Sequence, residues 1–258
     1  MTPEDLMAAW LQRQLPADAA DWLLAQRDRL RVGVFERDFN LAISLAPRRL
    51  GKADLELGPD DLAAADRVRP GWDPRDWSVD QAARLVLLLA QGGDGAAFNA
   101  RLRGLLATAD LNESIALLRG LPLYPGPALH LAQAREGART AMRPVFEAVA
   151  HANPYPAEMF DEAGWNQLVL KALFIETTLA PIQGLDRRAN PTLMRMLCDY
   201  AHERWAAGRT VSPELWRCVG PWADAAARED LARVLRTGDA TERSAARAAL
   251  DTAPGQQD

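Results

Sequence analysis

The sequence predicts an all-α protein in which pairs of helices stack as an α-α superhelical array of the HEAT or TPR kind, with a compact irregular helical bundle as the alternative. Apolar residues recur with a 3.6-residue period along most of the 258 residues, and no sustained β-strand alternation occurs. Near the end, Gly238 closes one helix and Asp239, with Glu242 three residues later, opens another. Two short helices joined by a tight turn are the repeating unit of such an array.

Proline, glycine and capping residues delimit the helices of the N-terminal part. Pro16 starts a new helix and Pro47 is expected to end the third. Glycine and proline interrupt the segment 48–77 repeatedly, which predicts an irregular connector with one short helix. The expected helices are Pro3 to Gln14, Ala17 to Leu30, Val34 to Leu45, Asp60 to Arg67 and Val79 to Gln91.

The same signals divide the remainder of the chain. Pro144 is expected to kink one long helix, and the segment 180–189 is expected to form a loop. Asn190 before Pro191 is typical of a helix N-cap followed by proline at the first helical position. The expected helices are Gly95 to Ala107, Leu111 to Gly120, Pro127 to Ala152, Ala157 to Thr177, Pro191 to Ala207, Ala223 to Thr237 and Asp239 to about Leu250. We therefore expect about 10–12 helices in a single domain over residues 1–252, and a disordered tail over 253–258.

Composition excludes several classes of function. A net charge of −5 and a pI near 5.4 argue against a nucleic-acid-binding protein. The longest apolar runs are far shorter than the roughly 20 residues of a membrane span, so no transmembrane segment is expected. The N-terminus carries Glu4 and Asp5 where a secretory signal would carry basic residues. Two cysteines do not make a disulfide framework, and we expect a protein of the reducing cytoplasm.

Three polar residues fall on the apolar sides of predicted helices. Asn166 and Glu176 lie among apolar positions of the helix that ends near Thr177, and Arg204 lies among those of the helix that begins at Pro191. An unpaired buried charge or amide is costly, so each needs a partner. We predict that Arg204 is at least half buried and pairs with Glu176 or Asp186, which are likewise expected to be buried. The pair is expected to be a structural ion pair or, less often, part of a ligand site.

Catalytic, metal and anion sites have weaker support. Cys198, Asp199 and His202 share one helix at spacings that metal ligands or a nucleophile and base use, but no further ligand is evident. Arg187 and Arg188 precede the helix start at Asn190, where an anion can be held. We therefore predict no catalytic residue, no metal and no cofactor.

A family resemblance adds what periodicity does not provide. It is carried by the segments LPLYPGP, EGARTAMRPVFEAVAHANPYP, NPYPAEMFDEAGWNQLVLKALF, GLDRRANPTLMRMLCDYAHERWAAGR and SPELWRCVGPW, over roughly Leu121 to Trp222. These segments resemble the EboA family of bacterial proteins, and the likeness extends more loosely to both ends. The resemblance implies a cytoplasmic helical protein that helps to mature a specialised metabolite or its precursor, or to move it towards the periplasm. It supplies no established catalytic residue.

The resemblance also implies companion proteins from the same gene cluster. These resemble a UbiA-type membrane prenyltransferase, a TatD-like hydrolase, a dehydroquinate-synthase-like enzyme and a sugar-phosphate isomerase. The favoured hypothesis is a non-enzymatic adaptor, scaffold or carrier that binds such an enzyme or a small hydrophobic metabolite. Its expected contact residues are Asn166, Lys171, Arg187, Arg188 and His202. The alternative is an enzyme of unrecognised type, with a site drawn from Glu176, Asp186, Asp199, His202 and Arg204.

Overall fold

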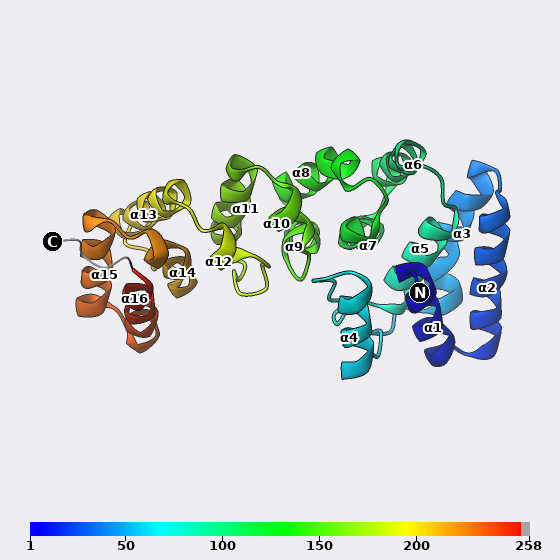
Figure 1. Cartoon of the computed structure of the whole chain (residues 1–258), viewed down its shortest axis with the longest axis horizontal. Coiled ribbons are helices and arrows are strands. Elements are labelled where there is room, and N and C mark those ends of the chain that lie inside the picture. Colours follow the sequence, from blue (N-terminus) through cyan, green and yellow to red (C-terminus); the bar gives the residue numbers. More distant parts are fainter. Residues whose placement is uncertain (254–258) are drawn as a thin grey trace. The chain divides into compact units, whose positions relative to one another are not determined.

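The computed structural model describes residues 1–253, which form sixteen α-helices, four short 3-10 helices and no β-strand (Figure 1). The all-α prediction is confirmed, but the expected number of helices was too low because several predicted helices are divided. The chain forms two compact units, which we call unit 1 (Met1–Met159) and unit 2 (from Phe160 onward). The superhelical array, its bundle alternative and the single domain over 1–252 stay predictions. All of the predicted tail except Ala253 lies outside the described residues.

Unit 1 contains the first ten α-helices. They are α1 (Pro3–Gln14), α2 (Ala17–Val32), α3 (Glu36–Leu50), α4 (Pro59–Val68), α5 (Val79–Ala90), α6 (Gly95–Thr108), α7 (Leu111–Arg119), α8 (Leu131–Arg139), α9 (Arg143–Ala150) and α10 (Tyr155–Met159). Two 3-10 helices, η1 (Leu121–Leu123) and η2 (Pro127–His130), connect α7 to α8.

Helix α5 forms the centre of the core of unit 1. Its sequence VDQAARLVLLLA is apolar on nearly all sides, and all but two of its residues are buried. Such a helix needs neighbours around it, and α5 contacts α1, α2, α3 and α7. The two charged residues of this helix, Asp80 and Arg84, are buried with it and form an ion pair.

The connector before α5 is held more firmly than its glycine and proline content suggests. Trp72 and Trp77 are buried, and the Trp72 ring lies 5.5 Å from that of Trp10 in α1. The Leu55 N–H donates to the Trp77 carbonyl at 2.8 Å, beside an isolated antiparallel bridge between Asp54 and Ser78. Aromatic packing and backbone pairing therefore order this irregular segment.

Two prolines act differently from expectation. Pro47 does not end α3, because the helix continues for one further turn, Leu50 is buried and the Gly51 N–H donates to the Pro47 carbonyl. Pro144 does not kink a long helix. The predicted helix over 127–152 is η2, α8 and α9, and Pro144 lies in the first turn of α9, where a missing N–H costs nothing.

Unit 2 contains six α-helices within the described residues. They are α11 (Glu162–Phe174), α12 (Leu185–Arg188), α13 (Pro191–Ala206), α14 (Trp216–Val219), α15 (Ala225–Thr237) and α16 (Ala240–Thr252), with 3-10 helices η3 (Pro213–Leu215) and η4 (Gly220–Trp222) on either side of α14. Helix α13 contacts α11, α14 and α15, and α16 packs against α14 and α15. Trp165, Leu197 and Trp216 are buried in this core.

Local capping explains most helix starts in unit 2. Asn190 accepts from the Leu193 N–H, Asp224 from the Ala227 N–H, and Asp239 from the Glu242 N–H, each at 2.8–2.9 Å. Other boundaries differ from expectation. The predicted helix over 157–177 is divided into α10 and α11 and ends at Phe174, and the predicted loop over 180–189 contains the single turn α12.

Candidate functional site

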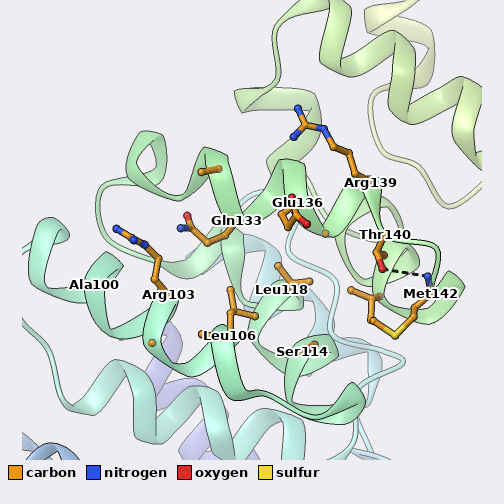
Figure 2. Close-up of a pocket in the computed structure, with 15 residues that line it drawn as sticks. Ala100, Arg103, Leu106, Ser114, Leu118, Gln133, Glu136, Arg139, Thr140 and Met142 are labelled. Atoms are coloured by element: carbon orange, nitrogen blue, oxygen red, sulfur yellow. Dashed lines mark hydrogen bonds between the residues drawn. The ribbon is translucent and has the colours of Figure 1, made fainter.

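Four neighbouring helices of unit 1 surround a groove of about 900 Å³, which we call the α6–α9 groove (Figure 2). Helices α6 and α8 both contact α7, and α9 contacts α7 and α8. Leu106, Leu118 and Val145 supply apolar lining from α6, α7 and α9, and Met142 from the α8–α9 linker is half exposed beside them. The Met142 N–H donates to Thr140 Oγ1 at 3.2 Å, which orders this linker. The groove is therefore apolar inside and open to solvent.

Small residues on the facing helices create this space. Ala100, Gly104 and Ala107 recur at helical spacing along α6 and line the groove. A Cβ at Gly104 would meet no atom within 4 Å, so this position faces open space. Gly137 of α8 acts differently, because a Cβ there would lie 2.8 Å from Val149 and 2.9 Å from Leu118. Gly137 lets α8 approach α7 and α9, whereas the small residues of α6 leave the groove unfilled.

Charged and polar side chains border the apolar lining. Arg103 comes from α6, and Gln133, Glu136 and Arg139 come from α8. Figure 2 shows Arg103 and Gln133 towards one end of the groove and Arg139, Thr140 and Met142 towards the other. Arg103 makes no hydrogen bond or ion pair with any residue of the range 1–253. Gln133 Oε1 is buried without a hydrogen-bond partner in that range, although buried polar atoms are nearly always paired.

In unit 2, two of the residues singled out from the sequence take part in one hydrogen-bonded cluster. Asn166 is 1% exposed and exchanges side-chain hydrogen bonds with Asn190 at 2.8 and 3.2 Å. Arg188 donates to the Phe160 carbonyl at 2.7 Å, and its guanidinium lies 5.0 Å from the Trp165 ring. Burial, and then the neighbouring Arg187, lower the pKa of Arg188. These contacts join α11 to the start of α13, so Asn166 and Arg188 are already engaged within the protein.

Only part of the pairing predicted for Arg204 is found in the structure. Arg204 is largely buried, with Nη2 3.7 Å from Glu176 Oε1 and Nε donating to the Thr210 carbonyl at 3.0 Å. Glu176, however, is 74% exposed, so its prediction as a buried group was wrong. The helical wheel does not apply at this position, because α11 ends at Phe174 and Glu176 has a left-handed φ of 54°. The prediction of Asp186 as a buried group was also wrong, because it is exposed and receives two hydrogen bonds of 2.6 Å from Arg217 instead of pairing with Arg204.

A second cavity, of about 470 Å³, is lined by Glu176 and Arg204 together with hydroxyl and carboxylate side chains. Its other carboxylates stabilise the fold. Glu214 accepts from the Leu179 and Ala180 N–H groups, and Asp239 and Glu242 form the capping box of α16. Asp199 and His202, the other members of the predicted enzyme site, are not among its lining residues. The alternative site is thus not brought together.

His202 and Cys198 lie one helical turn apart on α13. His202 is 52% exposed, and its Nε2 lies 2.7 Å from Asp230 Oδ1 of α15. Cys198 is buried, and its pKa is raised to about 12 by burial first and then by the Asp230 carboxylate. A thiol with such a pKa stays protonated, so Cys198 is poorly suited to act as a nucleophile. Within residues 1–253, no group of three or more His, Cys, Asp or Glu side chains can hold a metal ion.

Two predicted contact residues remain. Lys171 is partly exposed and Arg187 is exposed, and neither residue lines either cavity. The α6–α9 groove was not predicted from the sequence. Its one signal is the row of small residues at Ala100, Gly104 and Ala107, whose pattern predicts only a weakly apolar side of the helix. That row marks a groove only when the position of α8 is known.

Comparison with known proteins decides the family. The family model described as metabolite traffic protein EboA matches residues 3–220 of the 258. The chain belongs to the EboA family. No curated protein and no solved structure matches it. The resemblance noted over Leu121 to Trp222 is confirmed and extends over most of the chain.

The EboA match includes every residue that lines the α6–α9 groove. It also includes Asn166, Arg188 and the other residues singled out from the sequence, up to Arg204. In the described part of this EboA family member, no helix combines the length and the apolar character that crossing a membrane requires.

Proposed function

We propose that this EboA family member is a non-enzymatic carrier that holds an apolar or amphipathic metabolite in the α6–α9 groove during metabolite traffic. The observation that supports this proposal is the groove itself, whose volume of about 900 Å³ lies within the range of roughly 300–1,000 Å³ typical of small-molecule sites. Burial of apolar ligand surface against Leu106, Leu118 and Val145 would supply the driving force for binding. The family description supports a role in metabolite traffic, and the groove is large enough for a small-molecule cargo.

The lining of the groove favours binding over chemistry. It contains neither histidine nor cysteine, and its ionisable side chains are those of Arg103, Glu136 and Arg139. A hydroxyl at Ser114 or Thr140 has no imidazole beside it among the lining residues that would activate it as a nucleophile. A site with an apolar interior and few polar groups at its edge suits selective holding and release of a ligand.

We further propose that the cargo passes between this chain and enzymes of the same gene cluster, on the route towards the periplasm. The partners proposed are the prenyltransferase-like, hydrolase-like and isomerase-like proteins that the family resemblance implies. Arg187 and His202 are exposed on unit 2 and are the residues proposed for contact with such a partner. Copurification of the full chain with each enzyme, repeated with Arg187→Ala and His202→Ala, tests this part of the proposal separately from cargo binding.

Filling the groove tests the carrier proposal. Gly104→Trp places an indole in open space on α6, whereas Gly104→Ala adds one methyl group and improves helix propensity. Ala63→Trp, on an exposed face of α4, is the matched control for adding a tryptophan. We expect the wild-type protein, Gly104→Ala and Ala63→Trp to bind an apolar fluorescent probe, and Gly104→Trp to lose that binding with its circular dichroism unchanged. Equal probe binding by all four proteins would contradict the proposal.

A further inference from the structure

We infer that the α6–α9 groove selects amphiphiles with an anionic headgroup, which Arg103 and Gln133 receive while the apolar tail lies along Leu106 and Leu118. This inference rests on the carrier function proposed above and specifies the class of cargo. It is drawn from the two polar groups of the groove whose bonding capacity is unused, and from the balance of charge around its edge.

Arg103 is the first of these groups. Its side chain is exposed at the edge of the groove, and no residue in the range 1–253 forms an ion pair or hydrogen bond with it. A guanidinium offers five donors in a planar fork that matches carboxylate and phosphate oxygens. The other arginine of the lining, Arg139, does have an interaction within the protein. Arg103 is therefore the cation available to a ligand.

Gln133 is the second group. Its Oε1 atom is shielded from solvent and receives no hydrogen bond from the described residues, which is unfavourable unless a ligand or water supplies a partner. Rotation of the amide by half a turn places Nε2 at the same point, so the side chain can accept from a hydroxyl or donate to an anion. Figure 2 shows the Gln133 and Arg103 side chains at the same end of the groove, on α8 and α6.

The charges around the groove limit the charge that a ligand can carry. Of the three charged side chains of the lining, Arg139 already interacts within the protein, which leaves one cation, Arg103, and one carboxylate, Glu136, without an ion-pair partner in the described residues. Glu136 lies on α8 one turn after Gln133 and has no ion-pair partner in the described residues. It disfavours a second negative charge next to the first and allows a singly charged head beside Arg103. An apolar lining beneath one available cation is complementary to an amphiphile with a single anionic group.

Headgroup selectivity at constant tail length tests this inference. Dodecanoate, dodecyl phosphate, dodecanol and dodecyltrimethylammonium are titrated against the full chain below micellar concentrations, with displacement of an apolar fluorescent probe as the readout. We expect dodecanoate, with its single charge, to bind about threefold to tenfold more tightly than the alcohol, and the cationic amphiphile to bind most weakly. Dodecyl phosphate, which carries close to two negative charges at neutral pH, should bind less tightly than dodecanoate because of Glu136. Comparison of carboxylate with phosphate then distinguishes the two possible sources of the anion.

Substitutions test whether Arg103 is the residue that causes the preference for anionic headgroups. Arg103→Gln should remove most of the preference for anions while leaving dodecanol binding unchanged, and Arg103→Lys should keep most of it. Arg37→Gln, at an exposed arginine of α3 outside the groove, should leave the preference intact. Gln133→Leu should weaken binding of the anionic amphiphiles more than binding of dodecanol.

The outcomes separate this inference from the function on which it rests. If dodecanol displaces the probe from wild-type protein but not from Gly104→Trp, and no headgroup is preferred, the groove stands as a binding site and anion selection is wrong. Equal loss of the preference in Arg103→Gln and Arg37→Gln would likewise overturn the role of Arg103. If none of the four amphiphiles displaces a probe that Gly104→Trp fails to bind, the inferred class of cargo is wrong, whereas equal probe binding by wild-type protein and Gly104→Trp contradicts the carrier proposal itself.

Discussion

Asn166 and Asn190 donate hydrogen bonds to each other through their side-chain amides, at 2.8 and 3.2 Å, between α11 and the start of α13. Asn190 Oδ1 also accepts from the Leu193 N–H at 2.8 Å and so caps α13. The Asn190 side chain thus caps the start of α13 and provides the hydrogen-bond partner of the buried Asn166 amide on α11. Replacing Asn190 leaves the Leu193 N–H and the Asn166 amide without these partners.

This double role predicts that replacing Asn190 lowers the free energy of unfolding by more than the loss of a helix cap alone. Asn190→Ala removes the cap, worth about 1 kcal/mol, and leaves the Asn166 amide buried without a partner, which costs about 1–3 kcal/mol more. We expect the free energy of unfolding in urea to fall by about 2–4 kcal/mol. Asn40→Ala, at an exposed asparagine of α3, serves as the control. A similar small loss for both variants would show that the amide pair does not stabilise unit 2.

The buried ion pair of α5 predicts that folding stability depends strongly on both of its partners, Asp80 and Arg84. Asp80 and Arg84 are almost completely buried, the Ser78 hydroxyl donates to Asp80 Oδ1 at 2.7 Å, and Arg84 Nη2 lies 3.5 Å from Glu113 Oε1. Asp80→Ala should cost about 3–5 kcal/mol of unfolding free energy, because it leaves the guanidinium buried without its main partner. The double variant Asp80→Leu with Arg84→Met should recover much of that loss.

An exposed pair of the same spacing provides the control for this experiment. Arg143 and Glu147 are also four residues apart in a helix, but both are partly exposed to solvent. Arg143→Ala, at the more exposed partner, should cost less than about 1 kcal/mol. If Asp80→Ala were as mild as Arg143→Ala, the buried pair would contribute no more than a surface contact.

His130 predicts a loss of stability in mild acid. Its ring is fully buried beside Phe98 and Tyr124, with Nε2 2.9 Å from the Pro125 carbonyl oxygen. Burial lowers the pKa of His130 below its ordinary value of 6.5, and the hydrogen bond to Pro125 offsets part of this effect. As the pH falls below 6.5 the unfolded chain binds this proton first, so folding stability decreases with falling pH.

The measurement compares unfolding free energies at about pH 7.5 and about pH 5.5, on either side of the ordinary histidine pKa. The wild-type protein should lose more stability between these values than His130→Gln, whose side chain does not titrate. Equal losses in the two proteins would assign the acid sensitivity to other groups.

Glu176 predicts a variant that is more stable than the wild-type protein. Its N–H donates to the Leu173 carbonyl and the Thr177 N–H to that of Ala172, which closes α11 with the left-handed residue usually supplied by glycine. Glu176→Gly should raise the unfolding free energy by about 0.5–1 kcal/mol, since the exposed contact with Arg204 contributes little. Glu176→Ala keeps the strained backbone and should not be stabilised. A gain by both variants would point instead to repulsion by the Glu176 carboxylate.

The parts of the fold that the sequence reveals are those set by local chemistry. The start of α13 at Asn190 and of α16 after Asp239 depend on a side chain and the amide groups two or three residues further on. The division between α8 and α9 was not foreseen, because apolar periodicity continues through residues 140–142. Glu176 was misplaced for a related reason, since a helical wheel assumes a helix that has already ended there.

The candidate site was harder to predict because it depends on distances between helices. The sequence predicts a buried amide at Asn166, but it marks the partner of that amide, Asn190, only as a helix cap. The groove required the positions of α6 and α8 relative to α7. No local pattern distinguishes Gly104, which faces open space, from Gly137, which is in close contact with Leu118 and Val149.

Photocrosslinking is the most direct test of ligand binding in the α6–α9 groove, because it locates the ligand on the chain. An apolar amphiphile with a diazirine in its tail is bound to the full protein and irradiated, and the labelled peptides are identified by mass spectrometry. We expect labels on peptides that contain Leu106, Leu118 or Met142, and their loss in Gly104→Trp. Labels confined to unit 2, or unchanged by Gly104→Trp, would contradict it.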